Sequence, residues 1–101
     1  MDIGDVTVET FTGREGEPFA IQFADAKLEL TLAEVVRPPG EWGRTDRREP
    51  FSLLFHGPVE HMLGQQIWFL DHDELGRLGM FLVPLAARQD EGVAVYEAVF
   101  N

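Results

Sequence analysis

Short runs of aromatic and β-branched residues, separated by turn-forming residues, fill the second half of the chain. Four of these runs are predicted to be strands, at residues 50–56, 65–70, 77–85 and 93–100. Such side chains favour the pleated, half-buried surface of a sheet, and Gly, Pro, Asn and Asp between them are typical of turns. The run at 77–85 is apolar on both faces, which predicts a central strand, and Pro84 is expected to mark its end.

The first half contains a predicted antiparallel hairpin. Residues 19–23 and 27–36 alternate apolar and polar side chains on either side of a tight turn at Asp25–Ala26. The alternation fails at Glu34, which falls on the face of Leu28, Leu30 and Leu32. Either a bulge shifts the register there, or Glu34 points inward and needs a cationic partner. The hypothesis is a partly buried carboxylate of Glu34 paired with Arg37, Arg47 or Arg48.

The whole pattern predicts one all-β domain over residues 1–101. Residues 5–11 allow a strand or one short helical turn with Asp5 as its N-cap, and we favour the turn. Residues 1–17 form an N-terminal segment, and residues 37–49 form a long Pro/Gly/Arg loop. Sequential antiparallel pairing is the simplest topology, and six twisted strands tend to curl. We therefore expect a six-stranded antiparallel meander curled into a small barrel or half-open barrel.

Charge narrows the range of partners. Eight basic residues against 18 acidic residues give a net charge of −10, which disfavours nucleic acid and anionic membranes as partners. Four arginines lie between positions 37 and 48 against two acidic residues, so this segment carries 4 − 2 = +2. The N-terminus lacks the features of a signal peptide and no run is long enough to span a membrane, so a cytoplasmic protein is expected.

Three motifs carry a resemblance to a known family. They are an EPFSLLF-x-GP segment at 49–58, an L-x-H-x-E-L-G turn at 70–76 that leads into an FLVP strand at 81–84, and a YEAVFN ending at 96–101. With these motifs the chain resembles a family of small uncharacterised bacterial all-β domains, classed as a domain of unknown function. The resemblance implies a fold and no catalytic residue. Some relatives are similar in genomic setting to phage-tail-collar-like proteins, which implies an accessory role in tail-like or secreted assemblies.

Candidate chemistry is sparse. The chain has no cysteine, so thiol nucleophiles and zinc–thiolate sites are excluded. His72, with Asp71, Asp73, Glu74 and His61, has no standard metal spacing, and a solvated polar turn is the simpler interpretation. Ser52 lies inside a predicted strand and not on an exposed elbow. We therefore expect no catalytic residue, no metal and no cofactor.

The long loop is the best candidate for a binding surface. Trp42 has no strand to belong to, and Arg44, Arg47 and Arg48 lie close to it in sequence. Trp and Arg are enriched at interface hot spots, which favours a protein-binding site, although Trp42 could instead cover an open end of the barrel. The sequence thus favours a non-enzymatic protein-binding or assembly module. The alternative is a small-ligand or carbohydrate-binding barrel, possibly hydrolytic, using Trp42 and His72.

Overall fold

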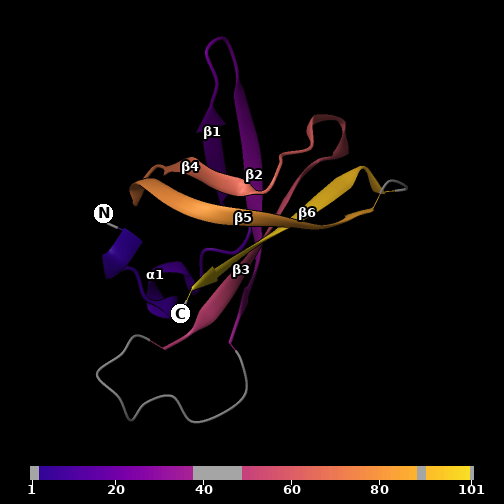
Figure 1. Cartoon of the computed structure of the whole chain (residues 1–101). Helices are drawn as coiled ribbons and strands as arrows, with labels where there is room; N and C mark the ends of the chain where they lie inside the picture. Colours follow the sequence, from indigo (N-terminus) through magenta and orange to yellow (C-terminus); the bar gives the residue numbers. More distant parts are fainter. Residues whose placement is uncertain (1–2, 38–48, 89–90, 101) are drawn as a thin grey trace.

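The computed structural model describes residues 3–37, 49–88 and 91–100, which form a closed six-stranded antiparallel barrel (Figure 1). The strands are β1 (Pro18–Gln22), β2 (Lys27–Val36), β3 (Phe51–Pro58), β4 (Gln66–His72), β5 (Gly76–Arg88) and β6 (Val93–Phe100). Short helical turns precede β1, at η1 (Ile3–Asp5) and α1 (Val8–Phe11), and η2 (Val59–His61) follows β3. The predicted barrel and the predicted N-terminal helical turn are confirmed.

The strand order is not the simple meander that the sequence suggested. The order around the barrel is β1-β2-β3-β6-β5-β4, so two three-stranded meanders meet through β3–β6 and β1–β4. The β3–β6 pairing runs from Phe51↔Phe100 to Pro58↔Val93, over the whole of both strands. The rings of Phe51 and Phe100 stack at its first pair, 4.6 Å apart. The equal lengths of β3 and β6 and the stacking of Phe51 on Phe100 place β6, and not β4, beside β3.

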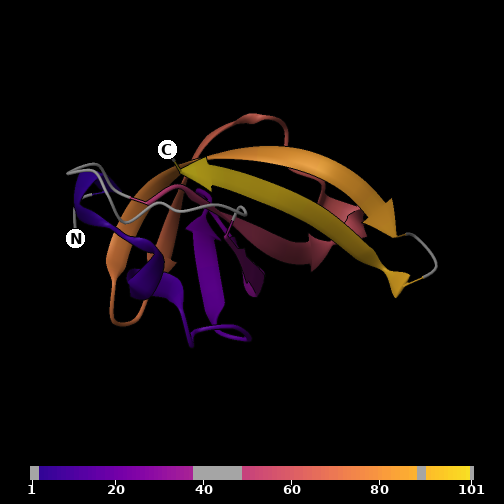
Figure 2. The same ribbon diagram turned by 90° about the horizontal axis from the view of Figure 1, so that it is seen from below.

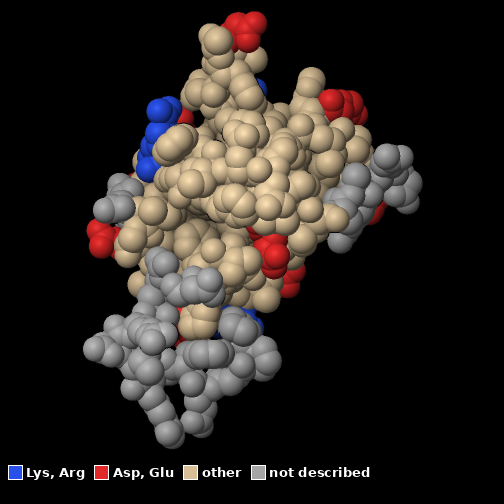
Figure 3. All heavy atoms as spheres, viewed as in Figure 1, with Lys and Arg blue, Asp and Glu red and all other residues tan. Residues whose placement is uncertain are grey.

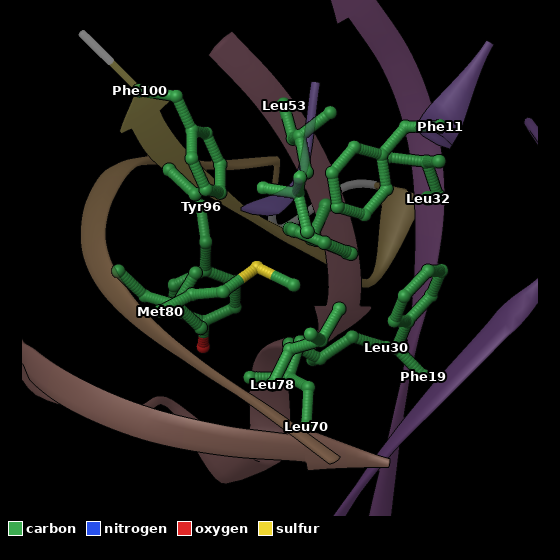
Figure 4. Packing of buried hydrophobic residues seen from close by; sticks show 14 of the residues in the cluster. Phe11, Phe19, Leu30, Leu32, Leu53, Leu70, Leu78, Met80, Tyr96 and Phe100 are labelled. Carbon is green, nitrogen blue, oxygen red and sulfur yellow. The ribbon is translucent and has the colours of Figure 1, made fainter. Parts of the chain in front are cut away.

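Buried aromatic rings meet at the end of the barrel where α1 lies, and Figure 4 shows Phe11 and Phe100 there together with Leu32 and Leu53. The fully buried ring of Phe11 in α1 lies 5.9 Å from the ring of Phe51 and 6.0 Å from that of Phe100. Burying one such side chain contributes about 1.5–3 kcal/mol, so α1 closes this end of the core despite its four residues. Its N-cap is Thr7 and not Asp5 as predicted, and the Thr7 N–H donates to Thr10 Oγ1 at 3.0 Å.

Two register shifts correct the sequence predictions. One lies between Leu32 and Glu34 and turns Glu34 outward, where it is exposed. The hypothesis of a buried Glu34 ion pair is therefore wrong, because the bulge moves the carboxylate off the leucine face. The second shift lies between Pro84 and Ala86, and β5 continues through it to Arg88. Pro84 does not end the strand, since a bulge tolerates a residue that cannot donate to the ladder. Figure 2 shows β5 and β6 continuing together as one long curved ribbon.

The barrel is weakest at the boundary between β1 and β4, which we call the seam. Ala20↔Asp71 is the one register pair between these strands within residues 3–37 and 49–88, whereas β4 and β5 share seven pairs, from Gln66↔Leu82 to His72↔Gly76. Ring contacts flank the single pair, Phe19 with His72 at 4.7 Å and Phe23 with Trp68 at 6.2 Å. In Figure 1 the β1–β2 hairpin projects beyond the strands it closes against. Side chains rather than backbone hydrogen bonds thus hold most of the seam.

Candidate functional site

His72 closes the turn between β4 and β5. Its side chain is 4% exposed, and its Nδ1 accepts hydrogen bonds from the backbone N–H groups of Glu74 at 3.0 Å and Leu75 at 3.1 Å. Because both partners are donors, Nδ1 is the unprotonated nitrogen, and Nε2 carries the hydrogen. Gly76 ends the turn with φ of 76°, a conformation that glycine adopts without steric cost. The prediction of a solvated turn organised by Asp71 or Asp73 is wrong, because a buried imidazole takes that role.

A charged network links this turn to the segment before β1. His72 Nε2 lies 2.6 Å from Glu17 Oε1. Arg14 lies 3.3 Å from the same oxygen and 2.7 Å from Glu74 Oε1. The hydrogen bond from His72, reinforced by Arg14, lowers the pKa of Glu17 below its ordinary value. This network fastens the N-terminal segment across the β4–β5 turn.

The network engages His72 with partners inside the protein. Both ring nitrogens of His72 are engaged within the protein, so neither is available as a base or ligand. Among the described residues, no group of three or more His, Asp or Glu side chains could hold a metal ion. Ser52 lies on β3 opposite Val36 and Val99, and β3 is not a neighbour of β4. The fold therefore does not assemble Ser52 with His72.

The predicted binding residues Trp42, Arg44, Arg47 and Arg48 lie outside the described residues. The structure does describe the two ends of that loop. Arg37 pairs with Glu49 at 3.3 Å and with Glu9 at 3.8 Å. The ion pair with Glu49 joins the end of β2 to the residues before β3, so the loop begins and ends at one place.

An exposed apolar surface lies on the outside of the β4–β5 hairpin. We call Ile67, Phe69 and Phe81 the outer face; they are 58%, 59% and 49% exposed. Ile67 is the register partner of Phe81, and Phe69 lies opposite Gly79. At the next outward pair Arg77 binds Asp71 at 2.7 Å, which lowers the pKa of Asp71. In Figure 3, which views this side, the surface over β4 and β5 is largely uncharged, with charged groups towards its margins.

The sequence did not reveal the outer face. Apolar residues on both faces of 77–85 predict a central strand. β5 does pair with a strand on each side, but Phe81 on its outer side is exposed. The signal was present in β4, where Ile67 and Phe69 alternate with Trp68 and Leu70. Two apolar faces on one strand indicate either two cores or one core and one exposed surface.

A hollow of about 460 Å³ lies beside the seam. Its walls come from the β1–β2 turn, from the connection after η2 and from Trp68 of β4; the apolar lining residues are Phe23, Ala26, Leu28, Met62, Leu63 and Trp68. Trp68 is held in place by the hydrogen bond from its Nε1 to the Gly64 carbonyl oxygen at 2.9 Å. The alternation of residues 19–23 puts Phe23 on the same face as Phe19 and Ile21, but Phe23 is 44% exposed because it lies beyond β1 at the edge of this hollow.

A family model for a domain of unknown function, DUF6916, matches residues 6–100. The chain belongs to the DUF6916 family. No curated protein and no solved structure matches it. Among the described helices of this DUF6916 domain, none is long and apolar enough to cross a membrane.

Two of the three sequence motifs described above have structural roles in the barrel. In L-x-H-x-E-L-G, Leu70 and Leu75 are buried, His72 closes the turn and Glu74 binds Arg14. In YEAVFN, the buried Tyr96 hydroxyl accepts a hydrogen bond from the Leu63 N–H at 2.9 Å. These interactions fix the β4–β5 turn and the β3–β4 connection, so both motifs stabilise the barrel.

Proposed function

We propose that this domain is a non-enzymatic protein-binding module and that it docks through the outer face. The observation that carries the proposal is the exposure of Ile67, Phe69 and Phe81 side by side on one rigid hairpin. Large apolar side chains that cluster on a surface mark interaction sites more often than single exposed ones do. The chain has a net charge of −10, but none of the three outer-face residues is charged.

The outer face has the composition of an interface centre. Aromatic residues dominate protein-binding hot spots, and a polar rim around them excludes water. Phe69 and Phe81 supply aromatic rings, and the Asp71–Arg77 ion pair supplies part of a rim. Burying each exposed ring against a partner contributes up to about 2 kcal/mol towards binding.

The experiment compares partner capture by matched variants. The wild-type domain is immobilised and incubated with lysate of the organism that produces it, and bound proteins are identified by mass spectrometry. Replacing Phe69 and Phe81 by serine should abolish capture of a protein that the wild type retains. Glu29→Ser changes an exposed side chain of β2 that lies outside both the outer face and the hollow, and serves as the control. Equal capture by all three proteins would refute the outer face as the docking surface.

The Arg37–Glu49 loop remains a second candidate surface. Its two ends are joined by an ion pair, so Trp42, Arg44, Arg47 and Arg48 belong to a loop with a fixed base. An accessory role in tail-like or secreted assemblies rests on the family resemblance and would fit a module with two contact regions.

A small-ligand or carbohydrate-binding barrel is the second candidate function. The hollow beside Trp68 favours it, since an aromatic wall and a volume of about 460 Å³ suit a small ligand. His72 does not line this hollow and cannot serve such a ligand as the sequence suggested. Titration with a panel of sugars and aromatic acids, followed by the fluorescence of Trp68, tests this candidate.

A further inference from the structure

The seam leaves part of β4 with a strand neighbour on one side only. Residues 66–70 of β4 pair with β5, whereas the one register pair between β1 and β4 within residues 3–37 and 49–88 is Ala20↔Asp71. Beyond that pair, β1 and β2 turn back on each other, and the Phe23 N–H donates to the Ala26 carbonyl oxygen at 2.8 Å. The backbone of β4 before Asp71 therefore forms a strand edge inside an otherwise closed barrel. A strand edge is a template for pairing with another extended chain.

The hollow lies at this edge. Phe23 and Trp68 would be opposite each other if the Ala20↔Asp71 register continued, and their rings are 6.2 Å apart. Met62, which is 51% exposed, and half-buried Leu28 complete the apolar walls. A bulky apolar side chain of a segment lying along β4 could enter this space. Strand addition gains affinity from backbone hydrogen bonds and specificity from pockets for alternate side chains.

The charge beside the hollow indicates the chemistry of that segment. Lys27 and Asp25 are the charged residues in its lining, which also contains His61. Arg14, Arg37 and Arg77 form ion pairs with carboxylates, whereas Lys27 forms none with any residue that the structure describes. An ammonium group without a partner is a ready contact for an incoming carboxylate. Asp25 opposes a segment with more than one acidic residue at this point.

We propose that the seam binds an extended segment of a partner protein as an added strand along Gln66–Leu70. One bulky apolar side chain of the segment enters the hollow that Phe23 and Trp68 line, and one carboxylate meets Lys27. This inference deepens the proposed protein-binding function, but it concerns a different surface from the outer face. The seam proposal and the outer-face proposal can therefore fail separately.

The test selects peptides without knowledge of the partner. A library of short random peptides displayed on phage is panned against the whole domain. Enriched sequences should alternate β-favouring residues with one large apolar residue and one acidic residue. A chosen peptide is then titrated against a Trp42→Phe domain, in which Trp68 is the sole tryptophan and reports on the hollow. Binding should shift Trp68 fluorescence.

Matched variants assign the binding surface. Phe23→Ser should weaken the peptide by roughly tenfold, the usual loss when a hot-spot contact is removed. Lys27→Ala should weaken acidic peptides severalfold and leave versions with glutamine in place of the acid unchanged. The outer-face double variant, with Phe69 and Phe81 replaced by serine, should bind the peptide like the wild type. If instead the outer-face variant loses the peptide and Phe23→Ser retains it, the seam proposal fails and the outer face stands.

A backbone test separates strand addition from binding of a side chain alone. N-methylation of alternate peptide residues removes main-chain donors on one edge while keeping every side chain. One of the two N-methylated patterns should abolish binding, and the amides of residues 66–70 should gain protection from hydrogen exchange when the unmodified peptide binds. The proposal is refuted if no peptide is enriched. It is also refuted if both N-methylated patterns bind and free phenylpropionate gives the same Trp68 response, because the hollow would then be a small-molecule site.

Discussion

Nε2 of His72 lies 2.6 Å from Oε1 of Glu17, a contact that joins the end of β4 to the residue before β1 across 55 positions of sequence. The same imidazole accepts two backbone hydrogen bonds through Nδ1. It therefore stabilises a turn and a long-range contact at once. Its burial and its two occupied nitrogens explain why a histidine beside three acidic residues is structural.

Replacing His72 should separate these two roles. His72→Leu removes the acceptor for the N–H groups of Glu74 and Leu75 and should cost on the order of 2 kcal/mol or more of unfolding free energy. His72→Asn places an amide oxygen near the position of Nδ1 and should lose clearly less. Urea denaturation of both variants measures the difference. Equal losses would show that ring packing against Phe19, 4.7 Å away, matters more than closing the turn.

The folded protein should lose stability in mild acid through two carboxyl groups. The pKa of Glu17 lies below its ordinary 4.5 because of His72, and the pKa of Asp71 lies below its ordinary 3.8 because of Arg77. Between the pKa of each carboxyl group in the folded protein and its ordinary pKa, the unfolded chain binds more protons than the folded protein. The stabilisation is therefore complete at a pH above the ordinary pKa values. It is lost as the pH falls through the lower pKa values of the folded protein. Chemical denaturation from about pH 6 down to about pH 3 measures this. Glu17→Gln should flatten the decline, and an unchanged slope would contradict the assignment.

Tyr96→Phe should destabilise the barrel without changing its shape. The hydroxyl accepts the buried Leu63 N–H at 2.9 Å, and its loss leaves that donor without an acceptor, at about 1–3 kcal/mol. Thermal and urea unfolding measure the loss, while an unchanged far-ultraviolet circular dichroism spectrum serves as the control. A wild-type midpoint would mean that the Leu63 N–H finds another acceptor.

Phe69 should be energetically coupled to Gly79. A Cβ at position 79 would lie 3.0 Å from the Phe69 ring, so the ring covers the glycine across the β4–β5 pair. Gly79→Ala should destabilise the wild type by about 1 kcal/mol by displacing the ring. The same change in a Phe69→Ala background should be neutral or stabilising, because alanine is better than glycine in a strand. A double-mutant cycle with no coupling would place the Phe69 ring elsewhere in solution.

The Arg37–Glu49 loop keeps its own prediction. Replacing Trp42 and Arg44 by alanine should leave thermal stability nearly unchanged and abolish capture of a protein partner. Melting temperature and affinity capture, compared with the wild type, measure the two effects. A large loss of stability with capture intact would instead make Trp42 a cover for the barrel.

Local patterns determined most of the elements of this protein. The alternation of Leu28, Leu30 and Leu32 predicted β2 with its observed bounds, and the aromatic and β-branched runs predicted β3 to β6 within a few residues. These signals are local, since a strand with one buried face needs a period of two whatever lies against it. β5 shows the limit of the same reasoning, because a second apolar face predicts a central strand but does not tell what covers that face.

Tertiary structure alone decided the strand order, the bulges and the surfaces. The pairing of β3 with β6 depends on strand length and on Phe51 meeting Phe100, contacts between residues far apart in sequence. The fate of Glu34 depends on one inserted residue in the β2–β3 register, and the role of His72 on amides that only the folded turn brings to its ring. The sequence shows which side chains can be buried or bound, but which of them remain exposed is settled by what packs against them. For Phe69, Phe81 and Phe23, that is decided by neighbours contributed from other strands.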